Sequence, residues 1–110
     1  MTNNDLFESI FANLKVAESG GRHLNAQGKL TTSTAGAEGI TQVMPKTQAD
    51  PGYGVKPMKD KSQAEFERVG REYLQAMYRE YDGDWEKALA AYNAGPGNLN
   101  RAISKANAQG

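Results

Sequence analysis

Apolar residues recur at helical spacing in four stretches of this chain, and this pattern restricts the fold more than any other feature. Side chains three or four residues apart line one face of an α-helix. Glycine stands just after the first three stretches, at positions 20, 83 and 95, where the left-handed conformation commonly ends a helix. The first three predicted helices cover residues 6–18, 62–81 and 85–94. The fourth begins near residue 98 and extends to about residue 106. We therefore expect a mainly α-helical protein.

Capping signals stand near the predicted starts of three of these helices. Asp5 and Glu8 are spaced like a capping pair for the first, and Ser62 with Glu65 has the spacing of a capping box for the second. Asp84 can cap the third. These polar residues support the helix starts independently of the apolar spacing.

The stretch between the first two long helices has a different character. Residues 22–43 lose the helical period, and Gln27-Gly28 is suited to a hairpin turn, so a small β-hairpin region is expected there. We expect His23 on the surface of this hairpin and not in the role of a general base. Pro45 fits the first turn of a helix but not its interior, which predicts a short fifth helix over 45–49. Residues 50–61 should form a surface loop.

Length and composition exclude several classes of protein. A chain of 110 residues fits one domain, which we take as 1–110, and its 13 basic and 13 acidic residues argue against a nucleic-acid-binding module. No stretch approaches the roughly 20 apolar residues of a membrane span, and the first residues lack the pattern of a signal peptide. With no cysteine and a single histidine, we expect neither a metal site nor a cofactor. Catalysis would then depend on carboxylates and hydroxyls.

Glu18 is a carboxylate on the apolar face of the first predicted helix, four residues after Leu14 and seven after Phe11. Burial disfavours the charged form of a carboxyl, and the negative end of the helix dipole acts in the same direction. Both effects favour a protonated acid, which is the form that can act as a general acid. The alternative is a helix that ends one turn earlier and leaves Glu18 solvated.

Three sequence blocks follow one another in a fixed order: ESGG at 18–21, GAEGITQVMPKT at 36–47 and AYNAGPG at 91–97. Together they resemble the soluble lytic transglycosylase (SLT) domain, of the goose-lysozyme-like family that cleaves the glycan strands of bacterial peptidoglycan. The resemblance covers about residues 14–102. It implies an α+β, lysozyme-like fold of about five helices, with a cleft between the Glu18 end of the first helix and residues 36–44.

The resemblance also implies an activity, which is non-hydrolytic cleavage of the β-1,4 bond between N-acetylmuramic acid and N-acetylglucosamine. In this family, the glutamate that closes the first helix is the sole catalytic acid and base, and Glu18 matches it. The substrate's own O6 attacks C1, so the product is a 1,6-anhydromuramoyl end. Glu38 is the only other carboxylate in the three blocks, and we expect it to be solvated or to have a local structural role.

Five further residues are implied to bind the glycan. Gln42 matches a glutamine whose amide holds polar sugar substituents, and Ser33 matches a serine close to the catalytic carboxyl, although it could also be a turn residue. Tyr92 matches a tyrosine whose hydroxyl points towards the glutamate, and its position on an apolar helical stripe also fits a core aromatic. Asn93 matches an asparagine that fixes the local backbone. Met44 could line the cleft or belong to the core.

The long connection after Glu18 bears on the biological setting. Family members with such a connection occur often in phage virion proteins that open the cell wall during genome entry. The expected partner is peptidoglycan, on which the domain would act in the periplasm. The sequence does not give the localisation, but the long connection favours a phage virion, or a secretion or conjugation machine, as the setting. The isolated domain should be a monomer. Two alternatives remain open: a hydrolytic muramidase on the same fold, in which water attacks, and a noncatalytic glycan-binding or structural virion module.

Overall fold

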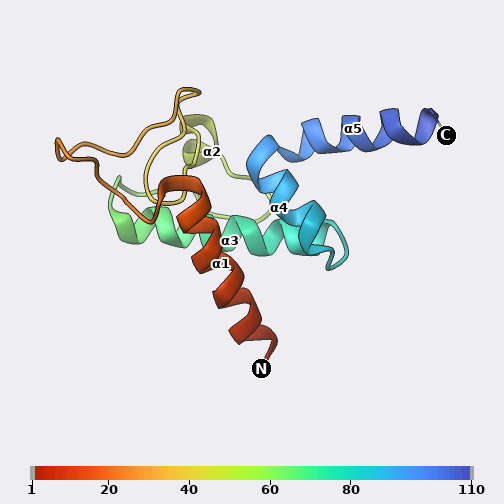
Figure 1. The fold of residues 1–110 in the computed structure, drawn as a ribbon, viewed down its shortest axis with the longest axis horizontal. Helices are drawn as coiled ribbons and strands as arrows, with labels where there is room; N and C mark the ends of the chain where they lie inside the picture. Colours follow the sequence, from red (N-terminus) through yellow and green to blue (C-terminus); the bar gives the residue numbers. More distant parts are fainter. Residues whose placement is uncertain (1, 110) are drawn as a thin grey trace. The chain divides into compact units, whose positions relative to one another are not determined.

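Five α-helices joined by loops make up residues 2–109, the part of the chain that the computed structural model describes (Figure 1). In chain order they are α1 (Asn3–Ser19), α2 (Pro45–Ala49), α3 (Gln63–Glu80), α4 (Trp85–Ala94) and α5 (Pro96–Ala108). The expectation of a mainly helical fold with five helices is confirmed. Within residues 2–109, no helix combines the length and the apolar character that crossing a membrane would require.

The chain divides into two compact units, Met1–Glu72 and Tyr73–Gly110, with the boundary inside α3. In the first unit the buried apolar residues are Phe7, Phe11, Leu14, Ile40, Val43, Val55, Phe66 and Val69. In the second they are Leu74, Ala76, Met77, Ala88 and Ala91. Each unit thus has apolar side chains of its own to bury. The expectation of one domain over 1–110 stays a prediction.

Charged side chains join α1 to the first part of α3. Lys15 Nζ lies 2.6 Å from Glu67 Oε1, and Arg71 is paired with Glu8. The Arg71 guanidinium also lies 4.8 Å from the centre of the Phe11 ring, close enough for a cation–π contact. These pairs flank the buried stripe of α1 and hold the helix at a defined position on α3.

Two predicted helix starts need correction. Thr2, and not Asp5, is the N-cap of α1: Thr2 Oγ1 accepts a hydrogen bond from the Asp5 amide at 3.0 Å, and Asp5 Oδ2 accepts one from the Thr2 amide at 3.3 Å. The capping pair expected between Asp5 and Glu8 is therefore wrong, because Asp5 occupies the third position of a box that opens three residues earlier. At the other end, α5 begins at Pro96 and not near residue 98, since proline is accepted at the first helical position.

The other capping predictions are confirmed in part or in full. Asp84 Oδ1 accepts a hydrogen bond from the Lys87 amide at 3.1 Å at the start of α4. Ser62 Oγ accepts one from the Glu65 amide at 3.2 Å, but the reciprocal half of this box is absent among the described residues. The Ser62 amide donates instead to Asp60 Oδ1 at 2.9 Å.

The expected hairpin consists of a turn with isolated bridges and contains no extended ladder within residues 2–109. Single antiparallel bridges join Leu24 to Leu30, Thr32 to Glu38, and Glu38 to Val43. The turn at 25–29 is closed by Asn25, whose Oδ1 accepts from the amides of residues 27 and 29 at 2.9 and 3.0 Å. The segment is therefore shaped by turns and side-chain hydrogen bonds more than by strand pairing.

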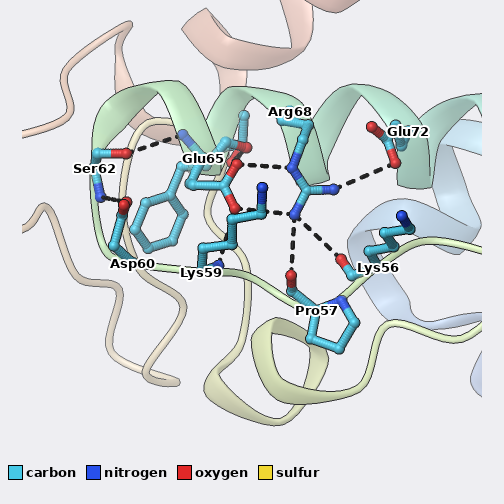
Figure 2. Close-up of polar contacts among 10 residues, drawn as sticks. Lys56, Pro57, Lys59, Asp60, Ser62, Glu65, Arg68 and Glu72 are labelled. Carbon is cyan, nitrogen blue, oxygen red and sulfur yellow. Dashed lines mark hydrogen bonds and ion pairs between the residues drawn. The ribbon is translucent and has the colours of Figure 1, made fainter.

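Arg68 fastens the loop that precedes α3 to the helix itself (Figure 2). Its guanidinium donates to the Glu65 carboxylate at 2.7 and 3.1 Å and to the carbonyl oxygens of Lys56 and Pro57 at 3.2 and 3.1 Å. The Lys59 amide adds a 2.9 Å bond to Glu65. These hydrogen bonds, that from Arg68 above all, lower the pKa of Glu65 to about 2. The predicted surface loop thus has a fixed position on α3.

Candidate active site

Glu18 lies in the last turn of α1 and is half-buried, one turn beyond the buried Leu14. Within residues 2–109, its carboxylate has no hydrogen-bond or ion-pair partner. Burial raises the pKa of Glu18 above its usual value. The direction predicted from the helical stripe is confirmed. A carboxyl whose pKa is raised, and that no neighbour within residues 2–109 stabilises as an anion, is better suited to donate a proton than an ordinary glutamate.

The residue after Glu18 ties the end of α1 to a distant turn. Ser19 Oγ lies 2.7 Å from the carbonyl oxygen of Ile40 and 3.0 Å from that of Lys15, so its hydroxyl can donate to either. Gly20 then ends the helix with a φ of 68°. Ser19 was not among the predicted site residues. A hydroxyl next to the glutamate was the available signal, but the sequence did not show which carbonyl it would reach.

The turn at 39–43 packs closely on α3. A Cβ on Gly39, whose φ is +77°, would come within 2.8 Å of the Phe66 ring. Thr41 is fully buried, and its Oγ1 donates to the Phe66 carbonyl at 2.8 Å. A Cβ on Gly70 would lie 2.6 Å from the methyl group of Thr41. The two glycines therefore allow this turn to approach the helix closely.

Gln42 uses its amide nitrogen inside the protein. Its backbone has a φ of 52°, which is unusual for a residue other than glycine. Nε2 donates to the carbonyl oxygens of Thr31 and Gly39 at 3.1 and 2.9 Å. Both amide hydrogens are therefore taken, and only Oε1 remains to meet a sugar as an acceptor. The predicted contact with the glycan stays a prediction, limited to that oxygen.

Ser33 and Met44 lie on either side of this turn in the sequence. The Ser33 hydroxyl accepts from the Ala37 amide at 3.0 Å, and the Ser33 amide donates to the Ala37 carbonyl at 2.9 Å, as expected for the turn residue that was the alternative to a substrate contact. Met44 is 42% exposed and precedes the first residue of α2. A core role for Met44 is thereby excluded, while a role in lining a cleft stays open.

Tyr92 and Asn93 belong to the second unit, near the end of α4. The Tyr92 ring meets the Tyr73 ring edge-on, with 5.8 Å between their centres. Asn93 is exposed, and the backbone beyond it is held by Asn98, whose Nδ2 donates to the Ala94 carbonyl at 2.7 Å. Tyr92 thus has the packing expected of a core aromatic. The approach of the Tyr92 hydroxyl to Glu18 and the part of Asn93 in substrate binding stay predictions.

Glu38 is held by neighbours in a way that Glu18 is not. Its Oε1 accepts from Lys61 Nζ at 2.8 Å and from Gln48 Nε2 at 2.9 Å. These bonds, that from Lys61 first, lower the pKa of Glu38. Gln48 is buried and also contacts Lys61 through its amide oxygen. The predicted local structural role of Glu38 is confirmed, and its carboxylate stays ionised.

His23 differs from the expectation of a hairpin surface residue. The half-buried ring lies 5.2 Å from the Phe66 ring, centre to centre. Its Nδ1 accepts from the Ile40 amide at 3.2 Å, and its Nε2 lies 3.2 Å from the Lys61 carbonyl oxygen. The prediction is wrong because the chain after α1 folds back over the 39–40 turn, a tertiary approach with no local sequence signal.

Comparison with known proteins gives matches over most of the chain. The family model described as the transglycosylase SLT domain matches residues 2–110. Over 83 residues the chain is 32% identical to membrane-bound lytic murein transglycosylase D of Escherichia coli (strain K12). The aligned region covers 72% of this chain and 18% of that protein. Over 107 residues the chain is 30% identical to the soluble lytic murein transglycosylase of the same strain, covering 87% of this chain and 16% of that protein. No solved structure gives a significant match.

The chain thus spans less than a fifth of the length of either relative. The family model, in contrast, extends across both structural units and all five helices. The order of sequence blocks, the helical fold and the family match agree, and they show that this chain belongs to the transglycosylase SLT domain family.

Proposed function

We propose that this domain is a peptidoglycan lytic transglycosylase. It would cleave the β-1,4 bond between N-acetylmuramic acid and N-acetylglucosamine and leave a 1,6-anhydromuramoyl end. Two relatives are named lytic murein transglycosylases, and the chain matches the SLT family over nearly its whole length, which supports this activity. The observation that carries the proposal is the half-buried Glu18, whose pKa is raised by burial and whose carboxyl is unpaired within residues 2–109.

In the proposed reaction, Glu18 acts twice. Its protonated carboxyl first gives a proton to the glycosidic oxygen, and the bond from that oxygen to C1 of N-acetylmuramic acid breaks. The 2-acetamido group of this sugar stabilises C1. The Glu18 carboxylate then removes the proton from O6, which bonds to C1 and closes the anhydro ring. Glu18 regains its proton, and no water is consumed.

A second catalytic carboxylate is not needed for this sequence of steps. Most glycosidases use two carboxyl groups, one of them as nucleophile or base. Glu38 is poorly suited to that role, because Lys61 and Gln48 occupy its carboxylate and lower its pKa. An attack by the substrate's own O6 replaces the water that a second carboxylate would activate.

Three of the glycan contacts in this proposal come from residues near the 39–43 turn that retain an accessible or unused group. Met44 is exposed beside the 39–43 turn, and Gln42 has its Oε1 as an acceptor. Ser33 is exposed at the turn over residues 33–37, which precedes the 39–43 turn. Tyr92 and Asn93 are the proposed contacts from α4.

The test compares Glu18→Gln with Glu38→Gln as a matched control. Each variant would be incubated with insoluble peptidoglycan, and the released fragments would be identified by mass spectrometry. We expect anhydro ends from the wild type and from Glu38→Gln, and no release by Glu18→Gln, because its amide keeps the shape of the side chain but cannot donate the proton. Circular dichroism would verify that the variants are folded.

Each other outcome points to a different function. Reducing ends from the wild type would show a hydrolytic muramidase. Binding to peptidoglycan without any release would show a noncatalytic module. Release by folded Glu18→Gln at the wild-type rate would remove Glu18 from the mechanism.

A further inference from the structure

His23 is the chain's single histidine, and the proposed reaction does not use it. The half-buried ring is tilted on the Phe66 ring at 5.2 Å and contacts two backbone groups, one in the 39–43 turn and one just before α3. It therefore joins three segments that are distant in the sequence.

The two contacts define which nitrogen of His23 carries the hydrogen. The Ile40 amide can only donate, so Nδ1, at 3.2 Å, must be the acceptor. The Lys61 carbonyl oxygen can only accept, so Nε2, also at 3.2 Å, must be the donor. The neutral ring with its hydrogen on Nε2 satisfies both. A protonated ring would place a second N–H against the Ile40 amide.

Ile40 is held from its other side by the residue that follows Glu18. Its carbonyl oxygen accepts from Ser19 Oγ at 2.7 Å, while its amide donates to His23. Ile40 is itself buried. Its main chain thus connects the imidazole with the end of α1.

We propose that neutral His23 is a positioning residue that sets the location of Glu18 through the main chain of Ile40 and the hydroxyl of Ser19. The inference rests on the proposed function of Glu18. His23 would not touch the glycan. Its part would be to keep the last turn of α1 at a fixed distance from the 39–43 turn.

The charged groups around His23 are already paired with one another. Lys61 Nζ, from the segment before α3, bonds to Glu38 at 2.8 Å. Glu67 of α3 bonds to Lys15 of α1 at 2.6 Å. The Lys15 bond is the main cause of the lowered pKa of Glu67. Each of these charged side chains therefore has a partner other than His23, and the imidazole is left to its two main-chain contacts.

The test uses two substitutions of His23. His23→Leu keeps an apolar body against Phe66 but has no acceptor and no donor. His23→Gln retains both an acceptor and a donor in its side-chain amide. Initial rates on purified peptidoglycan would give kcat and KM, and thermal unfolding would define a temperature at which every variant is folded.

We expect His23→Leu to lower kcat by roughly tenfold to a hundredfold with little change in KM, as misplacement of a catalytic group by about 1 Å does. His23→Gln should recover most of this loss. Full kcat for folded His23→Leu, or failure of His23→Gln to recover the lost kcat, would each overturn the proposal.

A double-mutant cycle with Ser19→Ala tests the route through Ile40. If both side chains act on the same peptide, the combined loss in His23→Leu/Ser19→Ala should be clearly smaller than the product of the two single losses. Independent, multiplicative losses would overturn that route. The wild type and Glu18→Gln, assayed alongside, separate the two hypotheses: if they fail to behave as a lytic transglycosylase and its inactive variant, the proposed function is wrong whatever His23 does.

Discussion

Substitution of Gly70 by alanine probes the contact that places the 39–43 turn on α3. The new Cβ would lie 2.6 Å from Thr41 Cγ2 and 2.8 Å from Thr41 Cβ, well inside van der Waals contact. Overpacking of this kind costs about 1–3 kcal/mol, whereas replacing glycine inside a helix returns at most about 1 kcal/mol. Displacing Thr41 also endangers its 2.8 Å bond to the Phe66 carbonyl, worth about 1 kcal/mol.

We therefore expect Gly70→Ala to lower the free energy of unfolding by about 1–3 kcal/mol, although alanine is the better helix former. In a domain of this size, that corresponds to a fall in Tm of about 4 °C or more. Urea and thermal unfolding followed by circular dichroism would measure both quantities. Glycan cleavage should fall as well, because the displaced turn carries Ile40.

Gly97→Ala is the matched control. Gly97 also lies in a helix, but a Cβ there would be 3.6 Å from Arg101 Nη1, an ordinary contact. Only the helix propensity should act, so we expect a change between zero and a gain of about 1 kcal/mol. If Gly70→Ala were as stable as Gly97→Ala, the close packing of Thr41 on α3 would be refuted.

Three further predictions concern the candidate site. Because folding raises the pKa of Glu18, its contribution to stability is complete below the unfolded pKa and is lost as pH rises through the folded pKa. Glu18→Gln should therefore be more stable than the wild type at neutral pH but not near pH ~4. If the unfolding free energies of the two proteins, measured in urea, changed in parallel with pH, this would be contradicted. Gln42→Ala loses two hydrogen bonds, so its unfolding free energy should fall by about 1–3 kcal/mol. Gln42→Gly loses the same bonds but relieves the strain of a φ of 52° that Gln42 already carries, so it should lose less stability than Gln42→Ala; equal Tm values for the two variants would exclude that strain. Tyr92→Phe keeps its ring contact with Tyr73 and removes only the hydroxyl, so kcat per folded molecule should fall roughly tenfold if the hydroxyl acts on Glu18; an unchanged kcat would exclude that role.

The helices could be predicted from sequence because their signals are local. Apolar spacing and a following glycine place α1 and α3 within a few residues of their observed bounds. The same spacing put Glu18 on the buried side of α1, and its raised pKa follows from that position alone. Pro96 was misread because the same residue can stop one helix or start the next, and only the path of the chain decides between them.

The contacts around the 39–43 turn could not be predicted in the same way. Ser19 and His23 each reach main-chain groups of Ile40, 21 and 17 residues away, and any residue at position 40 would offer the same carbonyl. Gln42 combines a positive φ with an amide that bonds to main-chain carbonyls inside the protein, and neither its size nor its polarity suggests this. Such contacts depend on how segments meet in three dimensions.

The way Ile40 is held has a consequence for how substitutions at this position should be interpreted. Its buried side chain fills the core, while its amide and carbonyl make the contacts to His23 and Ser19. Main-chain groups are shared by all amino acids except proline, which lacks the N–H. In a saturation mutagenesis experiment, position 40 should accept other apolar residues of similar volume and reject proline. Tolerance of different apolar residues at this position would therefore not mean that the position is unimportant, because the contacts to His23 and Ser19 are made by main-chain atoms.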